Sequence, residues 1–293
     1  MATKRTFEEN LALVKTRGAI AKADPPTLVV AKQLSLELWP DAVRGVPNAV
    51  LRGALFGVSK IRKTHKKRTL IAAVDGYEIH FKGETFNQRD FDVFQSMLHL
   101  AMPHQLGTRV EFSVHALLKQ LGRKTSGIEY EDFKNQMMRL IGGAVEIYSL
   151  ADKKAFVGTL VQSAKRDDET GRYVVTFDQD MLKLYQTGYT LVDWDERQAL
   201  SKNALAQWLQ GFYSSHVQPF GYKVETLHHL CGSTADLKEF RRMLRIALER
   251  LEEVGAIKNW EIEDGLVKVQ RVHTPTQIRH LTKKGKTKTR HVI

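Results

Sequence analysis

The sequence contains a single cysteine, Cys231, and no long run of apolar residues. One cysteine excludes a disulfide within the chain and a zinc site built from several thiolates. Because about 18 consecutive apolar residues are needed to cross a bilayer as a helix, the sequence predicts no transmembrane helix. The first ten residues are charged and lack the apolar region of a signal peptide, so we expect a cytoplasmic chain.

Motifs that hold nucleotides or metal ions are missing as well. The segment 285–287 resembles the end of a phosphate-binding loop, but His280 stands where that loop requires glycine. The eleven histidines show no zinc-ligand spacing. Cys231 lies on an apolar stretch, where a cysteine is typically a core residue. We therefore expect no metal ion and no cofactor, and a function based on binding rather than catalysis.

Two pairs of aspartates offer the one enzymatic alternative. Asp178 and Asp180, like Asp193 and Asp195, resemble the paired carboxylates of two-metal enzymes. Each pair stands just before a predicted helix, where an aspartate caps free backbone N–H groups. We favour the capping interpretation; the alternative is Mg²⁺-dependent cleavage of DNA by Asp193 and Asp195.

Acidic residues are too few to balance the basic ones. The chain has 293 residues, 45 Lys and Arg against 33 Asp and Glu, and a net charge of +12. Its length predicts about two domains, and its content of 42% apolar and 27% charged residues excludes wholesale disorder. These values indicate a globular protein with an excess of positive charge.

The positive charge is concentrated in two short stretches that contain no acid. The twelve basic residues that they hold equal the whole excess of positive charge: Lys60, Arg62, Lys63, Lys66, Lys67 and Arg68, then Arg279, Lys283, Lys284, Lys286, Lys288 and Arg290. Such patches suit a polyanion, because each phosphate they neutralise releases condensed counterions. The alternative is a pair of flexible segments that are merely solvated. No lipidation motif or amphipathic anchor adjoins them, so a membrane is not the expected partner.

The order of predicted elements repeats along the chain. A helix, a short helix, a turn, a longer helix and a β-hairpin occur at about 90–178 and again at about 195–273. This order is typical of a winged helix, a variant of the helix-turn-helix. We predict an α+β protein with two tandem winged-helix domains, at 69–190 and 191–275. An extended basic segment (1–68) would precede them, and a basic tail (276–293) would follow. The compact part would begin with a β-hairpin over 70–81, with Asp75-Gly76 at its turn.

The long helix of the second repeat carries a cationic strip. At about 100° per residue, four basic side chains fall on one outer side, away from the apolar side: Lys238, Arg241, Arg242 and Arg245. Arginine offers a bidentate fork to guanine O6 and N7, and all four could hold phosphate. We favour contact with DNA; the alternative is a solvated face stabilised by Glu239 and Glu249.

The corresponding helix of the first repeat is less cationic. Asn135 could pair with adenine N6 and N7, although solvent exposure explains it equally well. We expect this domain to hold phosphates more than it reads sequence. Its candidate DNA contacts are Arg123, Lys124, Lys134, Asn135, Arg139, Lys153 and Lys154.

The sequence resembles the TrfA-type plasmid replication initiators from about residue 30 onward. The most recognisable stretches are 204–213 (ALAQWLQGFY) and 240–245 (FRRMLR). The resemblance implies a plasmid-associated bacterial protein that binds direct repeats, or iterons, in double-stranded origin DNA. It also implies opening of an adjacent AT-rich segment, contact with the melted single strands, recruitment of the host replicative helicase and polymerase machinery, and dimers that limit copy number. A winged-helix transcriptional repressor is the alternative from another functional class.

One short segment fits the peptides that bind bacterial sliding clamps. Such peptides follow Gln-Leu-Ser-Leu-Phe or Gln-Leu-x-Leu-x-Leu, and the longer form is matched by Gln33, Leu34, Ser35, Leu36 and Leu38, with Glu37 breaking the shorter one. Exposed leucines ahead of a folded domain would otherwise be hard to explain. The alternative is that the segment docks on the folded part as an extra strand.

Overall fold

The computed structural model describes residues 39–74, 76–101, 109–216 and 219–272, all within one compact unit of the chain. The described part mixes helices and strands, so the α+β class is confirmed. None of its helices is long and apolar enough to cross a membrane.

Regular structure is present well before Leu70. The first elements of the described residues are β1 (Val43–Pro47), α2 (Asn48–Leu51) and β2 (Phe56–Gly57). Strand β1 pairs antiparallel with β11 (Tyr189–Asp193), and Val46 is fully buried in the core. The expectation of an extended segment up to residue 68 is therefore wrong for residues 43–57, because their apolar side chains pack against elements that come much later in the sequence.

A four-stranded antiparallel sheet follows. It has the order β3-β4-β7-β8 and consists of β3 (Thr64–Ile71), β4 (Tyr77–Glu84), β7 (Ala144–Ser149) and β8 (Lys154–Thr159). The hairpin expected around 70–81 is confirmed as β3 and β4. Ile79, Ile147 and Phe156 lie side by side on its buried face. The sheet thus joins residues about seventy positions apart.

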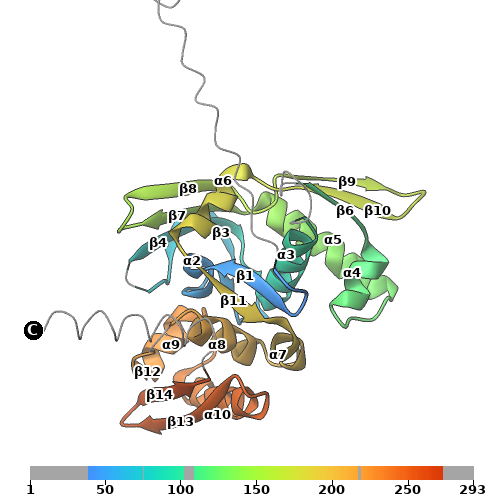
Figure 1. Ribbon diagram of the computed structural model, residues 1–293. Helices are drawn as coiled ribbons and strands as arrows, with labels where there is room; N and C mark the ends of the chain where they lie inside the picture. Colours follow the sequence, from blue (N-terminus) through green and yellow to red (C-terminus); the bar gives the residue numbers. More distant parts are fainter. Residues whose placement is uncertain (1–38, 75, 102–108, 217–218, 273–293) are drawn as a thin grey trace, which may run out of the picture. The chain divides into compact units, whose positions relative to one another are not determined.

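The first module, residues 88–176, contains the helices and the hairpin of the first repeat. Its elements are α3 (Gln88–Ala101), β6 (Arg109–Ser113), α4 (Val114–Gln120), α5 (Gly127–Gly142), β9 (Ser163–Asp167) and β10 (Arg172–Thr176), and β5 (Phe86–Asn87) precedes it. Its small sheet has the order β6-β10-β9. Figure 1 shows β9 and β10 as a long hairpin beside β6, apart from β7 and β8.

The second module, residues 204–271, repeats this order. It lacks a counterpart of β7 and β8, which lie between α5 and β9 in the sequence of the first module. Its elements are α8 (Ala204–Ser214), β12 (Tyr222–Lys223), α9 (Val224–Leu230), α10 (Leu237–Glu253), β13 (Ile257–Glu263) and β14 (Leu266–Arg271). Its sheet has the order β12-β14-β13, which matches the order in the first module. In each module the first strand pairs with the last one.

Short elements connect the modules: α6 (Gln179–Leu182), the 3₁₀ helix η1 (Lys183–Thr187), β11 and α7 (Trp194–Ala199). Asp178 accepts a hydrogen bond from the backbone N–H of Asp180, and Asp193 accepts one from Glu196. Both aspartates are therefore helix caps, as the sequence predicts.

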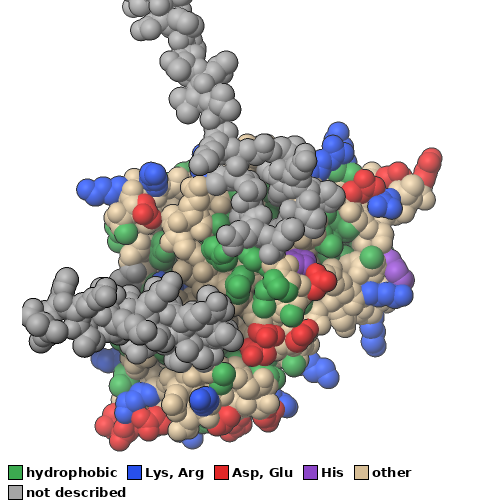
Figure 2. Space-filling view, viewed as in Figure 1, with side chains coloured by type: hydrophobic (Ala, Val, Ile, Leu, Met, Phe, Trp, Pro, Cys, Tyr) green, Lys and Arg blue, Asp and Glu red, His purple; other side chains and the backbone are tan. Residues whose placement is uncertain are grey.

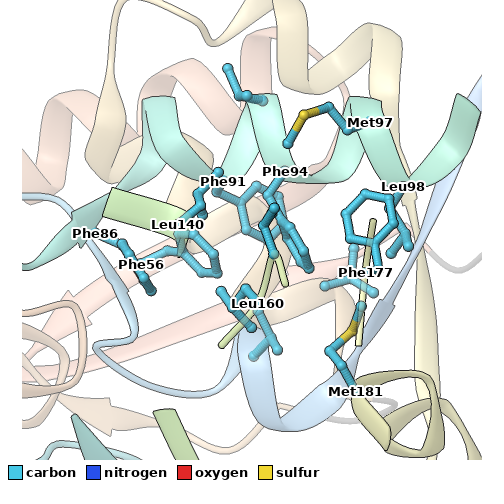
Figure 3. Packing of buried hydrophobic residues seen from close by; sticks show 14 of the residues in the cluster. Phe56, Phe86, Phe91, Phe94, Met97, Leu98, Leu140, Leu160, Phe177 and Met181 are labelled. Carbon is cyan, nitrogen blue, oxygen red and sulfur yellow. The ribbon is translucent and has the colours of Figure 1, made fainter. Parts of the chain in front are cut away.

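Two groups of buried apolar residues form the core. One belongs to the first module and the strands around it, and Figure 3 shows its centre, where Phe56, Phe91 and Phe94 pack together. The other belongs to the second module and includes Phe240 and Cys231. Burial raises the pKa of the Cys231 thiol to about 12, so this cysteine is an inert core residue, as expected.

A buried arginine joins the two groups. Arg197 on α7 is only 2% exposed and donates to Asp92 on α3 (Nε–Oδ1 2.7 Å), to Gln88 on α3 and to the backbone oxygen of Gln207 on α8. Its guanidinium also lies 4.4 Å from the centre of the Phe91 ring. The hydrogen bonds of this one guanidinium therefore connect α7 to α3 and α8, which come from different parts of the sequence.

Candidate nucleic-acid interface

The cationic strip lies on the exposed side of α10. Asp236 caps this helix by accepting from the backbone N–H of Glu239, and the buried side includes Phe240, Leu244 and Leu251. The four predicted DNA-contacting residues are all exposed: Lys238, Arg241, Arg242 and Arg245. The strip therefore faces solvent and not a neighbouring layer of the protein.

Two arginines of the strip have carboxylate partners at the surface. Arg241 pairs with Glu225 on α9 (2.7 Å), and Arg242 pairs with Glu239 one turn earlier on α10 (2.6 Å). The hydrogen bond from Arg242 lowers the pKa of the Glu239 carboxyl and raises that of the guanidinium. Because both pairs are about half exposed, each contributes little to stability, and a phosphate can replace the carboxylate.

The first basic stretch lies beside the turn that precedes α10. The backbone N–H of Val58 donates to the oxygen of Cys231 (3.0 Å), and the Ser59 and Thr234 hydroxyls are 3.0 Å apart. The chain then leads into β3, and the lysines before and on this strand are exposed: Lys60, Lys63, Lys66 and Lys67. We call these four residues the lysine ridge. Nothing in the sequence signals the contact of Val58 and Ser59, just before the ridge, with the turn at 231–234, because about 170 residues separate the two segments.

The arginines of the same stretch are engaged elsewhere. Arg62 and Arg139 both bind Asp90, a fully buried carboxylate on α3, and Arg139 does so at 2.9 Å with only 10% of its side chain exposed. Arg68 pairs with Glu146 on β7 (2.6 Å). The expectation that Arg62 and Arg139 stand free for phosphate is wrong, since both are held by the buried carboxylate of Asp90. Arg68 is 59% exposed and has a partner at the surface, as Arg241 and Arg242 do.

The first module places the other predicted residues in different surroundings. Arg123 is largely buried and donates to the Gln136 side chain and to the backbone oxygen of Arg89, so it acts as a structural residue instead of a free cation. Lys124, Lys134 and Asn135 are exposed, and Lys134 pairs with Glu131 (3.1 Å).

Lys153 and Lys154 belong to the β7–β8 hairpin, not to the hairpin of the first module. Both are exposed, and Lys153 takes a positive φ of 53° in the turn. Lys154 lines a groove of about 680 Å³ together with Tyr77, Phe156 and Lys183. The sequence predicts that these lysines border the strands of the winged helix; instead they border the four-stranded sheet, because β7 pairs with β4 and β8 pairs with β7.

The tips of the two module hairpins are acidic. Asp167, Asp168 and Glu169 lie at the turn between β9 and β10, and Glu263 and Asp264 lie at the turn between β13 and β14. Figure 2 shows acidic side chains at the end of the β13–β14 hairpin. These tips repel phosphate, so the cations of α10 and the lysine ridge are the better phosphate contacts.

Several predicted residues lie outside the described ranges. They are the clamp-motif residues Gln33, Leu34, Ser35, Leu36 and Leu38, and the tail residues Lys283, Lys284, Lys286 and Lys288. Within the described ranges, no group of three or more His, Cys, Asp or Glu side chains is arranged to hold a metal ion.

Known proteins resemble this chain along most of its length. The family model described as TrfA protein matches residues 19–271. A plasmid replication initiator protein TrfA from Escherichia coli is 26% identical over 289 residues, which cover 92% of this chain and 75% of that protein.

Two crystal structures of domains 2 and 3 of RctB share the fold. One has a TM-score of 0.53 and covers 78% of this chain and 99% of the other, and the second has a TM-score of 0.51 and covers 78% and 98%. Both are 11% identical to this chain, so this likeness concerns the fold alone. Because the family model spans most of the sequence, this chain belongs to the TrfA protein family of plasmid replication initiators.

Proposed function

We propose that the two modules are tandem winged-helix domains and that α10 enters the major groove of duplex DNA. The same order of helices and strands occurs in both modules, and both sheets pair their first strand with their last. In this architecture the third helix of each domain faces the groove, and α10 is the third helix of the second module. The likeness to RctB domains 2 and 3 supports the fold on which this depends.

The exposed strip on α10 carries the proposal. Lys238 and Arg245 have no carboxylate partner in the described part of the chain, and the partners of Arg241 and Arg242 are at the surface. A guanidinium in the major groove can donate two hydrogen bonds to guanine, and the remaining cations can hold the phosphates at the groove's edges.

The lysine ridge extends this surface at the N-terminal side of α10. It lies next to the turn at 231–234, so a duplex seated on α10 would pass close to Lys60 and Lys63. Contacts of this kind fix the protein on the backbone without reading sequence. The ridge therefore grips the phosphates that flank the groove.

Membership of the TrfA family gives this binding its biological setting. The chain binds direct repeats in the origin of its plasmid and helps to open an adjacent AT-rich segment, with its basic segments on the melted strands. It brings in the host replicative helicase, and the segment 33–38 binds the host sliding clamp. Dimers limit copy number. The chain hydrolyses no nucleotide in this scheme.

A pair of matched double variants tests the DNA contact. Arg242→Ala with Arg245→Ala is expected to lower the affinity for origin repeats at least a hundredfold in fluorescence anisotropy, because two charged contacts in the groove are lost together. The control, Arg250→Ala with Lys268→Ala, removes the same charge from exposed residues off the strip. Equal affinities for the two variants, both folded by circular dichroism, would refute the role of α10.

A separate experiment tests the clamp contact. The full chain with Gln33, Leu36 and Leu38 replaced by alanine should fail to retain the bacterial sliding clamp in a pulldown and should still bind origin DNA. Retention of the clamp by this variant as by the unaltered chain would rule out the segment as the binding site.

A further inference from the structure

The exposed face of α5 has a different chemistry from that of α10. The buried positions of α5 are Phe133, Gln136, Met137 and Leu140, and the same spacing recurs on α10 at Leu244, Ala247, Leu248 and Leu251. Matching these positions places Glu131 of α5 where α10 has Arg242, Lys134 where it has Arg245, and Asn135 where it has Ile246. The two exposed faces thus share one cation but differ at the position of Arg242.

Three uncharged side chains dominate the face of α5. Ile128 is 82% exposed and Met138 is 69% exposed, although both are large and apolar. Asn135 lies between them, is exposed, and has no hydrogen-bond partner among the described residues. The one acid on this face, Glu131, is neutralised by Lys134 at 3.1 Å. Among the described residues, no free guanidinium is present on this face, so it lacks the bidentate arginine contact to guanine.

The distance between the apolar side chains argues against a protein partner. Ile128 and Met138 are ten residues apart, about 15 Å along a helix, and two polar side chains separate them. They form no continuous apolar patch of the kind that protein interfaces bury. Along duplex DNA, about 15 Å corresponds to four or five base pairs at 3.4 Å each.

We propose that α5 reads A·T base pairs in the major groove. Asn135 donates to adenine N7 and accepts from adenine N6, which is the bidentate contact that an amide makes with this base and with no other. Ile128 and Met138 contact thymine methyl groups on either side, and the exposed Lys124 holds the backbone. The proposal rests on the proposed function, because it requires the first module to lie in a major groove.

The two modules then read different base pairs. The arginines of α10 select guanine, whereas α5 selects adenine and thymine. Since the third helices of two adjacent winged helices reach successive faces of the major groove, the two preferences should be about ten base pairs apart. The recognised repeat is therefore composed of an A·T block and a guanine-containing block.

Selection from a library of random duplexes tests this assignment. The full chain should select a motif with both blocks, and Asn135→Ala should lose the preference in the A·T block alone. Discrimination between A·T and G·C there should fall by about 5- to 150-fold, as expected for one bidentate contact. The control Gln179→Ala removes an exposed amide from α6 in the same part of the chain and should select the unaltered motif.

Uracil in place of thymine tests the methyl contacts directly. On the duplex selected by the unaltered chain, uracil in the A·T block removes the methyl groups and keeps the base pairs. It should weaken binding several-fold for the unaltered chain and leave the affinity of the variant with Ile128→Ala and Met138→Ala unchanged.

The possible outcomes separate this proposal from the one on which it rests. A selected motif that Asn135→Ala leaves intact overturns the reading of A·T by α5 while α10 keeps its role. Uniform weakening over all sequences overturns it as well, because it would mean contact with phosphate only. If the variant with Ile128→Ala and Met138→Ala changed its oligomeric state and still selected the same motif, α5 would be identified as a protein interface. Failure of the unaltered chain to select any duplex would instead refute the DNA-binding function as a whole.

Discussion

Two arginines on third helices show how the nearest carboxylate decides the role of a side chain. Arg139 on α5 is 10% exposed and binds Asp90, which is itself fully buried. Arg242 on α10 is 63% exposed and binds Glu239, which is 43% exposed. A guanidinium that leaves a buried carboxylate removes a charge partner that water cannot replace, whereas a solvated carboxylate is rehydrated when its guanidinium leaves. Arg139 is therefore a structural residue, and Arg242 can exchange partners.

Replacing Arg139 with alanine should reduce stability without affecting the recognition of DNA. The variant leaves Asp90 with Arg62 as its remaining cation, so we expect the free energy of unfolding to fall by about 3 kcal/mol, measured by urea denaturation. The folded fraction should keep its affinity for origin repeats. A loss of affinity with unchanged stability would contradict the structural role.

His216 makes the stability of the second module depend on pH. Burial lowers the pKa of its imidazole to about 4, and the nearby Arg52 and Arg271 act in the same direction. Its ring lies within hydrogen-bond distance of the Phe212 backbone oxygen and the Tyr222 hydroxyl. In the unfolded chain this pKa is about 6.5, so between 6.5 and 4 the unfolded state binds the extra proton. Stability is therefore complete above pH 6.5 and falls as the pH is lowered through this window.

The variant His216→Gln should lack this part of the acid sensitivity. Between pH 7 and pH 5 the unaltered chain should lose about 1 kcal/mol more of its unfolding free energy than the variant, once the partial exposure of the ring is allowed for. Urea denaturation at the two pH values measures the difference. Parallel losses in both proteins would show that other groups cause the pH dependence.

At the scale of elements, local patterns predict helices and turns but not the pairing of strands. The apolar spacing of Phe240, Leu244 and Leu251 identifies α10 and its outer strip, and Asp75-Gly76 identifies the β3–β4 hairpin. The sequence offers no comparable signal that β7 pairs with β4, because strand pairing depends on packing in the folded protein more than on local propensity. The placement of Lys153 and Lys154 was wrong for that reason.

For the candidate site as well, the sequence predicts local features but not long-range contacts. Exposure of Lys238, Arg241, Arg242 and Arg245 follows from helical periodicity, so the sequence predicts it correctly. The engagement of Arg62, Arg68 and Arg139 depends on carboxylates 28 to 78 residues away in the chain. Contacts over such separations arise only when the whole core is assembled.

The lysine ridge predicts a change in salt dependence. With Lys63, Lys66 and Lys67 replaced by alanine, affinity should fall for all duplexes alike, and the slope of log K against log salt should decrease by about 2 to 3. Anisotropy titrations between low and physiological salt measure the slope. Alanine at Lys183, Lys202 and Lys268 removes the same charge elsewhere on the surface and should leave the slope within about 1 of the unaltered value. Equal slopes for both triple variants would remove the ridge from the interface.

At the scale of the whole molecule, Arg197 holds together helices of both modules. Replacing it with methionine keeps an unbranched apolar stem but leaves Asp92 without its cation, so we expect the free energy of unfolding to fall by about 3 to 5 kcal/mol. Lysine should rescue little, because it cannot form the planar fork that reaches Asp92, Gln88 and the Gln207 oxygen together. Urea denaturation of both variants checks this, and stability equal to that of the unaltered chain would contradict it.

The pairing of β1 with β11 has a consequence for how the protein is made. Val43 lies opposite Asp193, so the earliest strand has no neighbour until a ribosome has added about 150 further residues. Until then Val46 and the strand's backbone groups are open to solvent and to other nascent chains. Closure over such a distance is slow, and a fragment that ends before β11 lacks the strand that pairs with β1.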